Sequence, residues 1–360
     1  MESSSLELID RLLKTIDSLI AVGDLKQAEE LCNSILAKDI NAASGEFLYL
    51  KGLITLKNEH YQDAVILLTE AVNNNPTNKK FKEELTVALM KAGQSCQDSG
   101  SFDEARNYYR CTLMINPNHE EAPEALVAMD MSGDYYLDVL EQIHIWLKPT
   151  AYLEIGVSRG ESMTLAKPPT FCVGIDPTPL IKVPFHTQTE LFKIESDRFF
   201  AEHDLPAILE GRKVDLSFID GLHTFEQVFR DFINVESYCH PDTIIVLHDC
   251  LPSDPITSAR NRISGWWTGD VWKVLPCLMK YRPDLAIIII PAPPSGLAII
   301  TRLDPESTLL EKRYNELVEE FQGLTFKEFE KIRDESFNLV TNEWETIEKH
   351  IKEARTNHQK

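Results

Sequence analysis

The sequence predicts an α/β fold: a seven-stranded, mostly parallel sheet with an antiparallel last hairpin, preceded by an α-helical repeat domain. Three observations lead to this prediction. The first third of the chain repeats a helical pattern, the middle alternates short apolar runs with helical segments, and the last two apolar runs are only six residues apart. We expect a repeat domain over 1–131, a sheet domain over 132–304 and a C-terminal helical extension over 305–360.

The N-terminal repeat is a pattern of small and large residues that occurs twice with identical spacing and once more loosely. The copies are Gly52, Tyr61, Ala64, Leu68, Ala71 and Pro76; Gly93, Phe102, Ala105, Tyr109, Thr112 and Pro117; and, more loosely, Ile16, Leu25, Ala28, Cys32, Ile35 and Ile40. An alanine after each turn lets the two helices of a hairpin approach closely. The copies lie 36 and 41 residues apart and resemble the tetratricopeptide repeat. Such a repeat either binds a partner protein in its groove or only caps or dimerises the next domain.

The sheet is expected after a helix over Glu120–Met129, a polar boundary at Ser132–Asp134 and a helix over Tyr135–Leu147. Seven apolar runs then predict the strands: Tyr152–Ile155, Phe171–Ile175, Thr189–Ile194, Val214–Ile219, Thr243–Leu247, Leu285–Ile290 and Leu297–Thr301. The linker over 291–296 is too short for a helical crossover, so the last two strands must pair antiparallel. Beyond Asp304, apolar residues at helical spacing predict amphipathic helices that dock on this chain or on a second subunit.

The composition sets limits on the class of partner and on the compartment. The formal net charge is −21, and so acidic a surface repels phosphate backbones and anionic lipids. We therefore expect no nucleic-acid and no membrane partner. The seven cysteines form no C-x-x-C pair, which favours a reducing compartment. The acidic, polar N-terminus does not read as a secretory signal, and the longest apolar run, Leu285–Ile290, is too short to span a bilayer, so a cytoplasmic protein is expected.

A glycine-containing loop after the first strand is the first candidate site. Gly156 and Gly160 permit a tight turn and close approach of a ligand to the backbone, and a following helix would offer free N–H groups. Asp176 follows Glu154 by 22 residues, about where a carboxylate would accept hydrogen bonds from ribose hydroxyls. Ser158 replaces the middle glycine of a dinucleotide fingerprint, so a dinucleotide oxidoreductase is the least favoured class. A bare structural turn remains the alternative.

A second candidate site follows the third strand, at Ser196 and Asp197. In sheets that bind nucleosides this edge commonly meets the adenine ring. The same residues also suit a helix N-cap ahead of Phe199 and Phe200, and both roles can hold together.

The third candidate site has two aspartates at the ends of neighbouring strands, Asp220 and Asp249. The carboxyl ends of parallel strands meet at the edge where open α/β sheets bind ligands. Two carboxylates there can hold a hard divalent cation such as Mg²⁺. In the alternative interpretation, Asp220 only turns the chain ahead of a capping box made by Thr224 and Gln227.

Two histidines accompany this pair, and either could act as a general base. His223 follows Asp220 by three residues, and His248 directly precedes Asp249. A single histidine is more often a hydrogen-bonded core residue, and this alternative is kept for His248. Asp220, His223 and His248 are the catalytic candidates.

These segments together resemble a known family over 135–303. They are similar to the Rossmann-like class I S-adenosylmethionine-dependent methyltransferases, in the bacterial branch with metal-dependent sugar and macrolide O-methyltransferases. The segments that carry the resemblance are Tyr152–Gly156, Phe218–Glu226, Leu247–Asp249 and Trp267–Lys273. The resemblance implies that S-adenosylmethionine is the cofactor, bound by Gly156, Ser158, Gly160 and Asp176. Glu154, Ser196 and Asp197 are further candidates for binding it. It also implies Mg²⁺ on Asp220 and Asp249. Cys250 departs from the amide found in catechol-type relatives, and a thiol is a poor Mg²⁺ ligand.

The expected function is methyl transfer to a hydroxyl of a sugar or glycosylated small molecule. A metal on two vicinal oxygens would lower their pKa and align the attack. Trp266 and Trp267, with Arg260 and Arg262, follow the Asp249 strand where acceptor loops often lie, whereas Trp272 suits ordinary packing. The rival interpretation is a non-catalytic scaffold whose repeats recruit a partner. A homo-oligomer is compatible with both.

Overall fold

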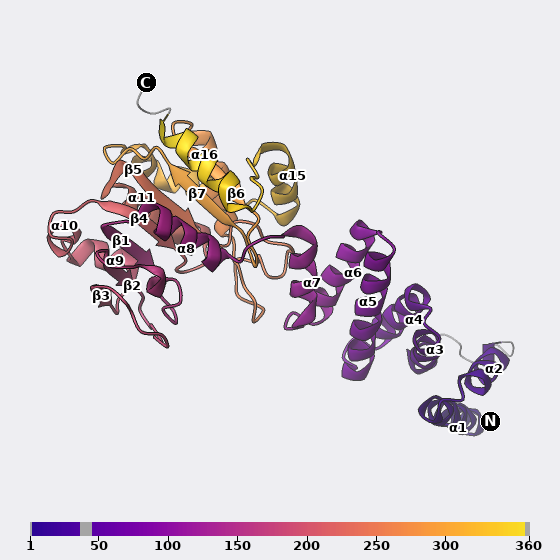
Figure 1. Ribbon diagram of the computed structural model, residues 1–360. Coiled ribbons are helices and arrows are strands. Elements are labelled where there is room, and N and C mark those ends of the chain that lie inside the picture. Colours follow the sequence, from indigo (N-terminus) through magenta and orange to yellow (C-terminus); the bar gives the residue numbers. More distant parts are fainter. Residues whose placement is uncertain (1, 37–44, 357–360) are drawn as a thin grey trace. The chain divides into compact units, whose positions relative to one another are not determined.

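The computed structural model describes residues 2–36 and 45–356 (Figure 1). The chain divides after Ala125 into two compact units, and each is described by itself. Ile40, the last residue of the loosest repeat copy, lies outside the described residues. None of the described helices combines the length and apolarity needed to cross a membrane.

The first unit is a run of helical hairpins that follows the repeat in the sequence. Its helices are α1 (Glu2–Val22), α2 (Leu25–Leu36), α3 (Gly45–Lys57), α4 (Tyr61–Asn74), α5 (Lys79–Asp98) and α6 (Phe102–Ile115), and α7 (Glu121–Asp130) spans the division. Equivalent residues make equivalent contacts in two hairpins. A Cβ at Gly52 would lie 2.7 Å from Leu68, and one at Gly93 would lie 2.6 Å from Tyr109. The predicted helical repeat is confirmed.

The second unit is built on the predicted seven-stranded sheet, in the order β3-β2-β1-β4-β5-β7-β6. The strands are β1 (Ala151–Ile155), β2 (Phe171–Ile175), β3 (Thr189–Phe192), β4 (Val214–Ile219), β5 (Cys239–Leu247), β6 (Ala286–Ile290) and β7 (Leu297–Thr301). Strands β1 to β5 pair parallel, and β7 pairs antiparallel with both β5 and β6. The fold class, including the antiparallel last hairpin, is confirmed.

Helices cover both faces of this sheet and keep its strands buried. One face packs against α8 (Tyr136–Leu147) and α16 (Trp344–Thr356), which lie across the strands in Figure 1. The other face is covered by α9 (Ser196–Glu202), α10 (Leu205–Ile208), α11 (Phe225–Glu236), α12 (Val274–Tyr281), α14 (Tyr314–Phe321) and α15 (Phe326–Ser336). Apolar residues therefore alternate between two cores along each strand, as in β1, where Leu153 faces one core and Tyr152 the other.

The expected helix after the glycine loop is absent from the described residues between β1 and β2. A single 3-10 turn, Met163–Leu165, replaces it. The prolines Pro168 and Pro169 lack backbone N–H donors, so a helix cannot continue through them, and the segment between Gly160 and Pro168 forms only this turn. This loop therefore offers no α-helix N-terminus to a ligand.

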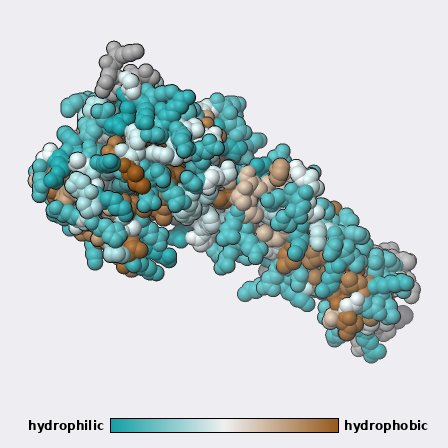
Figure 2. Space-filling model, viewed as in Figure 1, coloured by the Kyte–Doolittle hydropathy of each residue, from teal (hydrophilic) through white to brown (hydrophobic). Residues whose placement is uncertain are grey.

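The C-terminal helices pack on the sheet of their own chain. Leu310 of α13 (Leu309–Lys312), Leu317 of α14 and Phe329 of α15 belong to its buried core. The segment between α15 and α16 also pairs with the sheet edge. Ile289 of β6 donates its N–H to the Asn338 carbonyl and accepts from the Val340 N–H, both at 2.9 Å. The visible surface is mostly hydrophilic (Figure 2), as the acidic composition requires.

Candidate functional site

The loop after β1 is a left-handed turn that lies against the end of β4. Gly156, Ser158 and Gly160 all have positive φ, of 88°, 47° and 85°. The Gly156 N–H donates to the Ile175 carbonyl at 2.8 Å, which ties the loop to β2. A Cβ at Gly156 would lie 2.0 Å from the Asp220 carbonyl oxygen, so only glycine fits here. This backbone contact joins the glycine loop to the acidic site.

Asp176 closes the same loop from the end of β2. One carboxylate oxygen accepts the Ser158 N–H at 2.7 Å, and the other accepts the Thr178 N–H at 2.7 Å. The side chain is nearly buried, and each carboxylate oxygen retains a second lone pair. Asp176 can therefore hold the loop and still accept hydrogen bonds from a ligand.

Glu154 lies fully buried in the middle of the sheet. Its carboxyl oxygens accept hydrogen bonds from the Tyr152 hydroxyl and the Ser162 hydroxyl, both at 2.6 Å. Burial raises the pKa of this carboxyl to about 8, despite the two donors, so it carries a proton at neutral pH. Its predicted contact with the cofactor stays a prediction.

Ser196 and Asp197 open α9 at the end of β3, but neither caps the helix. The N-cap is Glu195, and it makes no side-chain capping bond, so the capping interpretation is wrong. The Ser196 hydroxyl instead donates to Asp231 at 2.6 Å, and Asp197 is held by Arg230 at 3.1 Å. Both side chains bind α11, which positions the β3 edge against that helix. Their contact with adenine stays a prediction.

Asp231 is a site residue that the sequence analysis missed. It is fully buried on α11, and burial raises the pKa of its carboxyl to about 6. Its Oδ2 has no hydrogen-bond partner among the described residues and lies 3.8 Å from where a Cβ on Gly221 would be. Nothing in the sequence separates this aspartate from other polar residues of an amphipathic helix.

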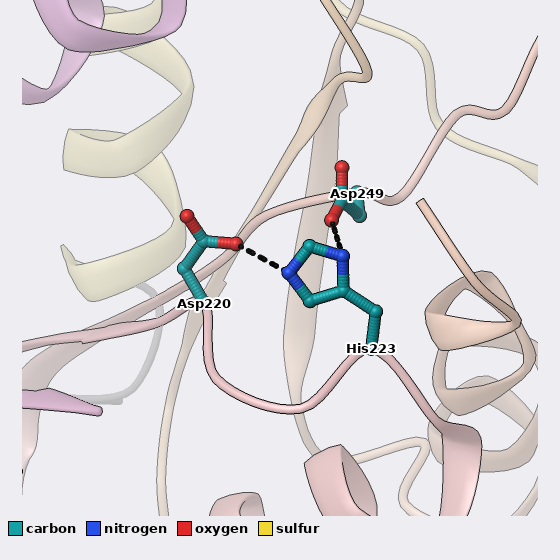
Figure 3. Close-up of side chains that lie close together, drawn as sticks. All are labelled: Asp220, His223 and Asp249. Atoms are coloured by element: carbon teal, nitrogen blue, oxygen red, sulfur yellow. Dashed lines mark ion pairs between the residues drawn. The ribbon is translucent and has the colours of Figure 1, made fainter. Parts of the chain in front are cut away.

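The acidic pair converges as predicted, with His223 between the two carboxylates (Figure 3). Asp220 follows β4 and Asp249 follows β5, and these strands pair parallel. His223 Nε2 lies 3.4 Å from Asp220 Oδ1, and Nδ1 lies 2.8 Å from Asp249 Oδ2. Asp249 adopts a left-handed backbone with φ of 58°, which turns the chain at the strand end.

These charges shift one another's protonation. Burial raises the pKa of Asp220, but the His248 and His223 imidazoles outweigh burial and hold that pKa well below its usual range. Burial lowers the pKa of His223, but the carboxylates of Asp249 and Asp220 outweigh it and hold the His223 pKa well above its usual range. In the protein alone, His223 therefore keeps a proton and neutralises part of the acidic pair.

The arrangement also fits a divalent cation. One ligand atom from each of Asp220, His223 and Asp249 lies within 4.8 Å of the others. Asp249 Oδ2 is buried and has no hydrogen bond of good geometry within the part of the chain that the structure describes, and the His223 ring nitrogen beside it also lies 2.9 Å from the Trp267 carbonyl oxygen. Two carboxylates with one imidazole suit Mn²⁺ or Mg²⁺. Cys250 is buried and burial raises the pKa of its thiol, whose sulfur lies 3.4 Å from the Leu247 and His248 carbonyl oxygens, and it is not one of the three converging residues.

His248 adjoins this cluster and faces both aspartates, with its Nδ1 3.6 Å from Asp249 Oδ1, but it is not one of the three residues whose ligand atoms converge. Its Nδ1 lies 3.1 Å from Asp220 Oδ1, and its Nε2 lies 3.2 Å from the Ser295 hydroxyl. The Tyr136 ring packs on it at 4.3 Å. The side chain is 8% exposed, against 25% for His223, so His223 is the histidine that reaches the surface of the site.

The expected capping box of Thr224 and Gln227 is wrong. The Thr224 side chain makes no capping bond at the start of α11. Asp270, from the loop after β5, accepts the Phe225 N–H at 2.8 Å and takes over this role. Asp270 also pairs with the buried Lys273 at 3.0 Å. A long-range carboxylate is a stronger acceptor than the local hydroxyl.

The loop after β5 packs against the backbone of His223. A Cβ at Gly269 would lie 1.7 Å from the His223 carbonyl oxygen. The Trp267 ring stacks on the His223 ring at 5.4 Å between centroids. Trp272 is buried against Phe329, as expected for ordinary packing.

The two arginines of this loop have partners within the chain. Arg260 binds Glu226 at 2.5 Å, and Arg262 donates to the Gly265 carbonyl at 2.9 Å. Trp266 and Trp267, both partly exposed, remain as the aromatic candidates for contact with an acceptor.

A protein-family model described as a methyltransferase domain matches residues 153–250. This segment runs from β1 to the residue after Asp249 and contains the glycine loop, the β3 edge and the acidic cluster. No curated protein matches the chain.

Solved structures give distant likenesses. The crystal structure of MamA is 21% identical, covers 34% of this chain and 66% of its own, just under two thirds, with a TM-score of 0.27. The second tetratricopeptide domain of human RPAP3 is 17% identical, covering 33% of this chain and 92% of its own at a TM-score of 0.25. The O-methyltransferase TomG from Streptomyces achromogenes, solved with S-adenosylmethionine, is 13% identical, covering 60% and 89% at a TM-score of 0.35.

Proposed function

Because the chain carries a class I methyltransferase domain behind an N-terminal helical repeat, we propose that it transfers a methyl group from S-adenosylmethionine to a hydroxyl of a sugar-bearing small molecule. The observation that carries the proposal is the contact of Gly156 with the Asp220 backbone. It places a nucleoside-type loop and an acidic cluster side by side at the carboxyl edge of the sheet, where α/β sheets bind ligands.

The cofactor would be held by the glycine loop and the residues that close it. A Cβ at Gly156 would collide with the Asp220 backbone, and one at Gly160 would collide with the Phe185 ring, so both glycines let this loop pack tightly against its own chain. Such a fixed turn supports a role in holding the cofactor. Asp176 has free lone pairs for two ribose hydroxyls, while Glu154, Ser158, Ser196 and Asp197 complete the predicted binding set. S-adenosylmethionine supplies the methyl group on a sulfonium, which leaves as a neutral thioether.

The acceptor side would be served by the acidic cluster. The hydroxyl oxygen forms a bond to the methyl carbon as the carbon–sulfur bond breaks, and the hydroxyl proton must leave. With a cation held by Asp220 and Asp249, His223 would be neutral and would not serve as a ligand. Its Nδ1–H is directed at the Trp267 carbonyl, so Nε2 would take the hydroxyl proton. A divalent cation on Asp220 and Asp249 would neutralise the carboxylates in place of the imidazolium and lower the pKa of the acceptor hydroxyl. With the cation bound, the charges of Asp220 and Asp249 would be balanced without a second proton on the His223 ring.

A vicinal diol on a sugar is the acceptor class that suits these groups best. Two adjacent oxygens match a cation held by two carboxylates, and the exposed part of Trp267 offers an aromatic face to a sugar ring. The internal pairing of Arg260 and Arg262 argues against a phosphate carrier as the main contact.

Calorimetry with S-adenosylhomocysteine tests the cofactor half of the proposal. We expect a single site with a dissociation constant in the micromolar range. Failure of well-folded protein to bind would leave the scaffold interpretation, in which the helical repeat recruits a partner and the sheet performs no chemistry.

Transfer of a labelled methyl group tests the acceptor half. Sugars with vicinal diols, glycosylated macrolides and catechols are offered with Mg²⁺, with Mn²⁺ and with a chelator. Asp220→Asn and Asp249→Asn should each lower turnover strongly and leave S-adenosylhomocysteine binding nearly unchanged. Asp242→Asn, at the opposite end of β5, is the matched control. Full activity in excess chelator would reject the cation and leave His223 as the sole candidate for activating the hydroxyl.

For the helical unit we propose the binding of a protein partner. Hairpin repeats expose extended surfaces that suit this role. A cavity of about 370 Å³ lies on this unit and is lined by Lys79, Lys82, Glu83, Thr86, Ile115 and Asn116. Charge reversal of Lys79 and Lys82 together should abolish co-purification of the partner while S-adenosylhomocysteine binding is kept. Unchanged co-purification would place the partner elsewhere.

A further inference from the structure

A line of buried hydrogen bonds runs from the β6–β7 turn into the acidic site. The Ser295 hydroxyl lies 3.2 Å from His248 Nε2, and His248 Nδ1 lies 3.1 Å from Asp220 Oδ1. Ser295 is 1% exposed and His248 is 7% exposed, whereas the Asp220 side chain is 21% exposed, so solvent can reach the line only at its Asp220 end. The role of Ser295 is invisible in the sequence because its partner stands 47 residues earlier in the chain.

Packing fixes the His248 ring in this line. The Tyr136 ring lies 4.3 Å from it on one side, and the Phe218 ring lies 6.0 Å away. Backbone bonds hold the turn that carries Ser295. The Leu251 N–H donates to the Ser295 carbonyl at 2.7 Å, and the Tyr136 N–H donates to the Pro293 carbonyl at 3.0 Å. His248 therefore cannot turn toward an acceptor without breaking both ends of the line.

The line acts on the carboxylate of Asp220. Oδ1 of this carboxylate receives His248 Nδ1 at 3.1 Å and faces His223 Nε2 at 3.4 Å. The Asp220 carboxylate can rotate about its Cβ–Cγ bond unless a hydrogen bond holds one of its oxygens. The His248 ring can hold Oδ1 in place because the ring itself is anchored at its other nitrogen. The Ser295 hydroxyl supplies that far anchor, because a flipped ring would present carbon atoms to both Ser295 and Asp220.

We propose that Ser295 and His248 are positioning residues that fix the rotation of the Asp220 carboxylate, and that neither touches the acceptor. The inference rests on the proposed function only in assigning Asp220 to the reacting site. It removes His248 from the candidates for the general base and leaves that role to His223.

The hydrogen-bond line is tested first in the protein alone, by NMR of selectively ¹⁵N-labelled histidine. The Nδ1–H of His248 should give a downfield resonance protected from solvent exchange, assigned by its loss in His248→Asn. Ser295→Ala should abolish or broaden that resonance. The matched control is Ser217→Ala, which removes another fully buried serine hydroxyl, donated to the Leu153 carbonyl at 2.8 Å, and should leave the resonance unchanged. A resonance that Ser295→Ala leaves unchanged would overturn the proposal.

Two substitutions of His248 separate positioning from base catalysis. The amide of His248→Asn can place a donor near the position of Nδ1 but cannot accept a proton at the site, whereas His248→Leu offers no donor. Loss of an outer partner of this kind lowers activity or metal affinity about 10- to 100-fold. We expect His248→Leu to show that loss in kcat and His248→Asn to recover most of it, with KM for S-adenosylmethionine unchanged in both. Equal, severe loss in both variants would make His248 the base and overturn the inference.

The two arms also separate this inference from the proposed function. If no acceptor is methylated by the unmodified protein, the proposed function fails, and the His248 resonance in Ser295→Ala alone decides whether the line exists. If methyl transfer is found and the resonance persists in Ser295→Ala, the function stands and the positioning role falls.

Discussion

Gly156 lies against the backbone of Asp220, so that a Cβ at position 156 would come within 2.0 Å of the Asp220 carbonyl oxygen. Gly156 follows β1 and Asp220 follows β4. In the proposed function, Gly156 serves the cofactor and Asp220 serves the acceptor. Because the contact is between backbone atoms, neither side can yield by changing a rotamer. Any movement of the cofactor loop must therefore move the start of the acidic loop as well.

Gly156→Ala should disturb the glycine loop and the acidic cluster together. Its φ of 88° is strained for any L-residue, and the added Cβ meets backbone rather than a flexible side chain. We expect a loss of stability above about 1–3 kcal/mol in urea unfolding and loss of S-adenosylhomocysteine binding by calorimetry. Gly211→Ala is the matched control, since Gly211 has a φ of 80° with nothing within 4 Å. Equal effects of the two substitutions would show that strain alone, and not the contact with Asp220, is responsible.

Asp176→Ala should weaken S-adenosylhomocysteine about 10- to 100-fold, as expected for roughly 1.5–3 kcal/mol of charge-assisted hydrogen bonds. Part of the loss will come from the loop, because the Ser158 N–H loses its acceptor. Calorimetry measures the affinity, and Asp242→Ala on the far side of the sheet serves as the control. An unchanged dissociation constant in Asp176→Ala would remove this residue from the cofactor site.

Glu154 should make the fold less stable as the pH rises. Burial raises the pKa of its carboxyl to about 8, whereas an unfolded chain titrates near pH ~4.3. Its stabilising contribution is therefore complete below about pH 4.3 and is lost as the pH rises through the folded value near 8. Glu154→Gln stays neutral at every pH and keeps partners for Tyr152 and Ser162. Between pH 5 and 8 its melting temperature should fall less than that of the unmodified protein, and parallel curves by circular dichroism would contradict the assignment.

Asp270→Ala should destabilise the sheet unit strongly. The substitution removes the acceptor for the Phe225 N–H and leaves Lys273, which is 5% exposed, without its carboxylate partner. Breaking a buried ion pair by removing one member costs roughly 3–5 kcal/mol, measurable in urea unfolding. Asp284→Ala is the comparison, because its side chain is 51% exposed and Arg282 keeps its buried pair with Glu236. A loss below about 1 kcal/mol in Asp270→Ala would show that the loop reorganises to supply another partner.

The features that the sequence predicted are those with local or periodic causes. Apolar runs predicted every strand, and the short linker over 291–296 predicted the antiparallel pairing of β6 with β7. The proximity of Asp220 and Asp249 could be predicted because neighbouring parallel strands end at the same edge of a sheet. The site roles of these residues remain predictions.

The features that the sequence could not predict depend on partners distant in the chain. Ser295 reaches His248, Asp270 caps α11 in place of Thr224, and Ser196 binds Asp231 instead of capping α9. For α11 and α9, local capping rules pointed to Thr224 and Ser196, and a carboxylate distant in the chain took the place of the local bond in each case. For Ser295, nothing in the sequence indicated a partner. The missing helix after Gly160 is a different case, because the two prolines that follow, Pro168 and Pro169, are local and visible in the sequence.

The backbone pairing of Ile289 with Asn338 and Val340 covers part of the free edge of the sheet. Strand β6 has the sequence Ala-Ile-Ile-Ile-Ile and would otherwise be the bare border of the sheet. An unprotected border of four isoleucines is a template on which other chains can polymerise. The segment over 338–340 thus protects the edge of its own sheet from pairing with other chains. A chain shortened before position 338 would expose this strand and should form β-rich aggregates.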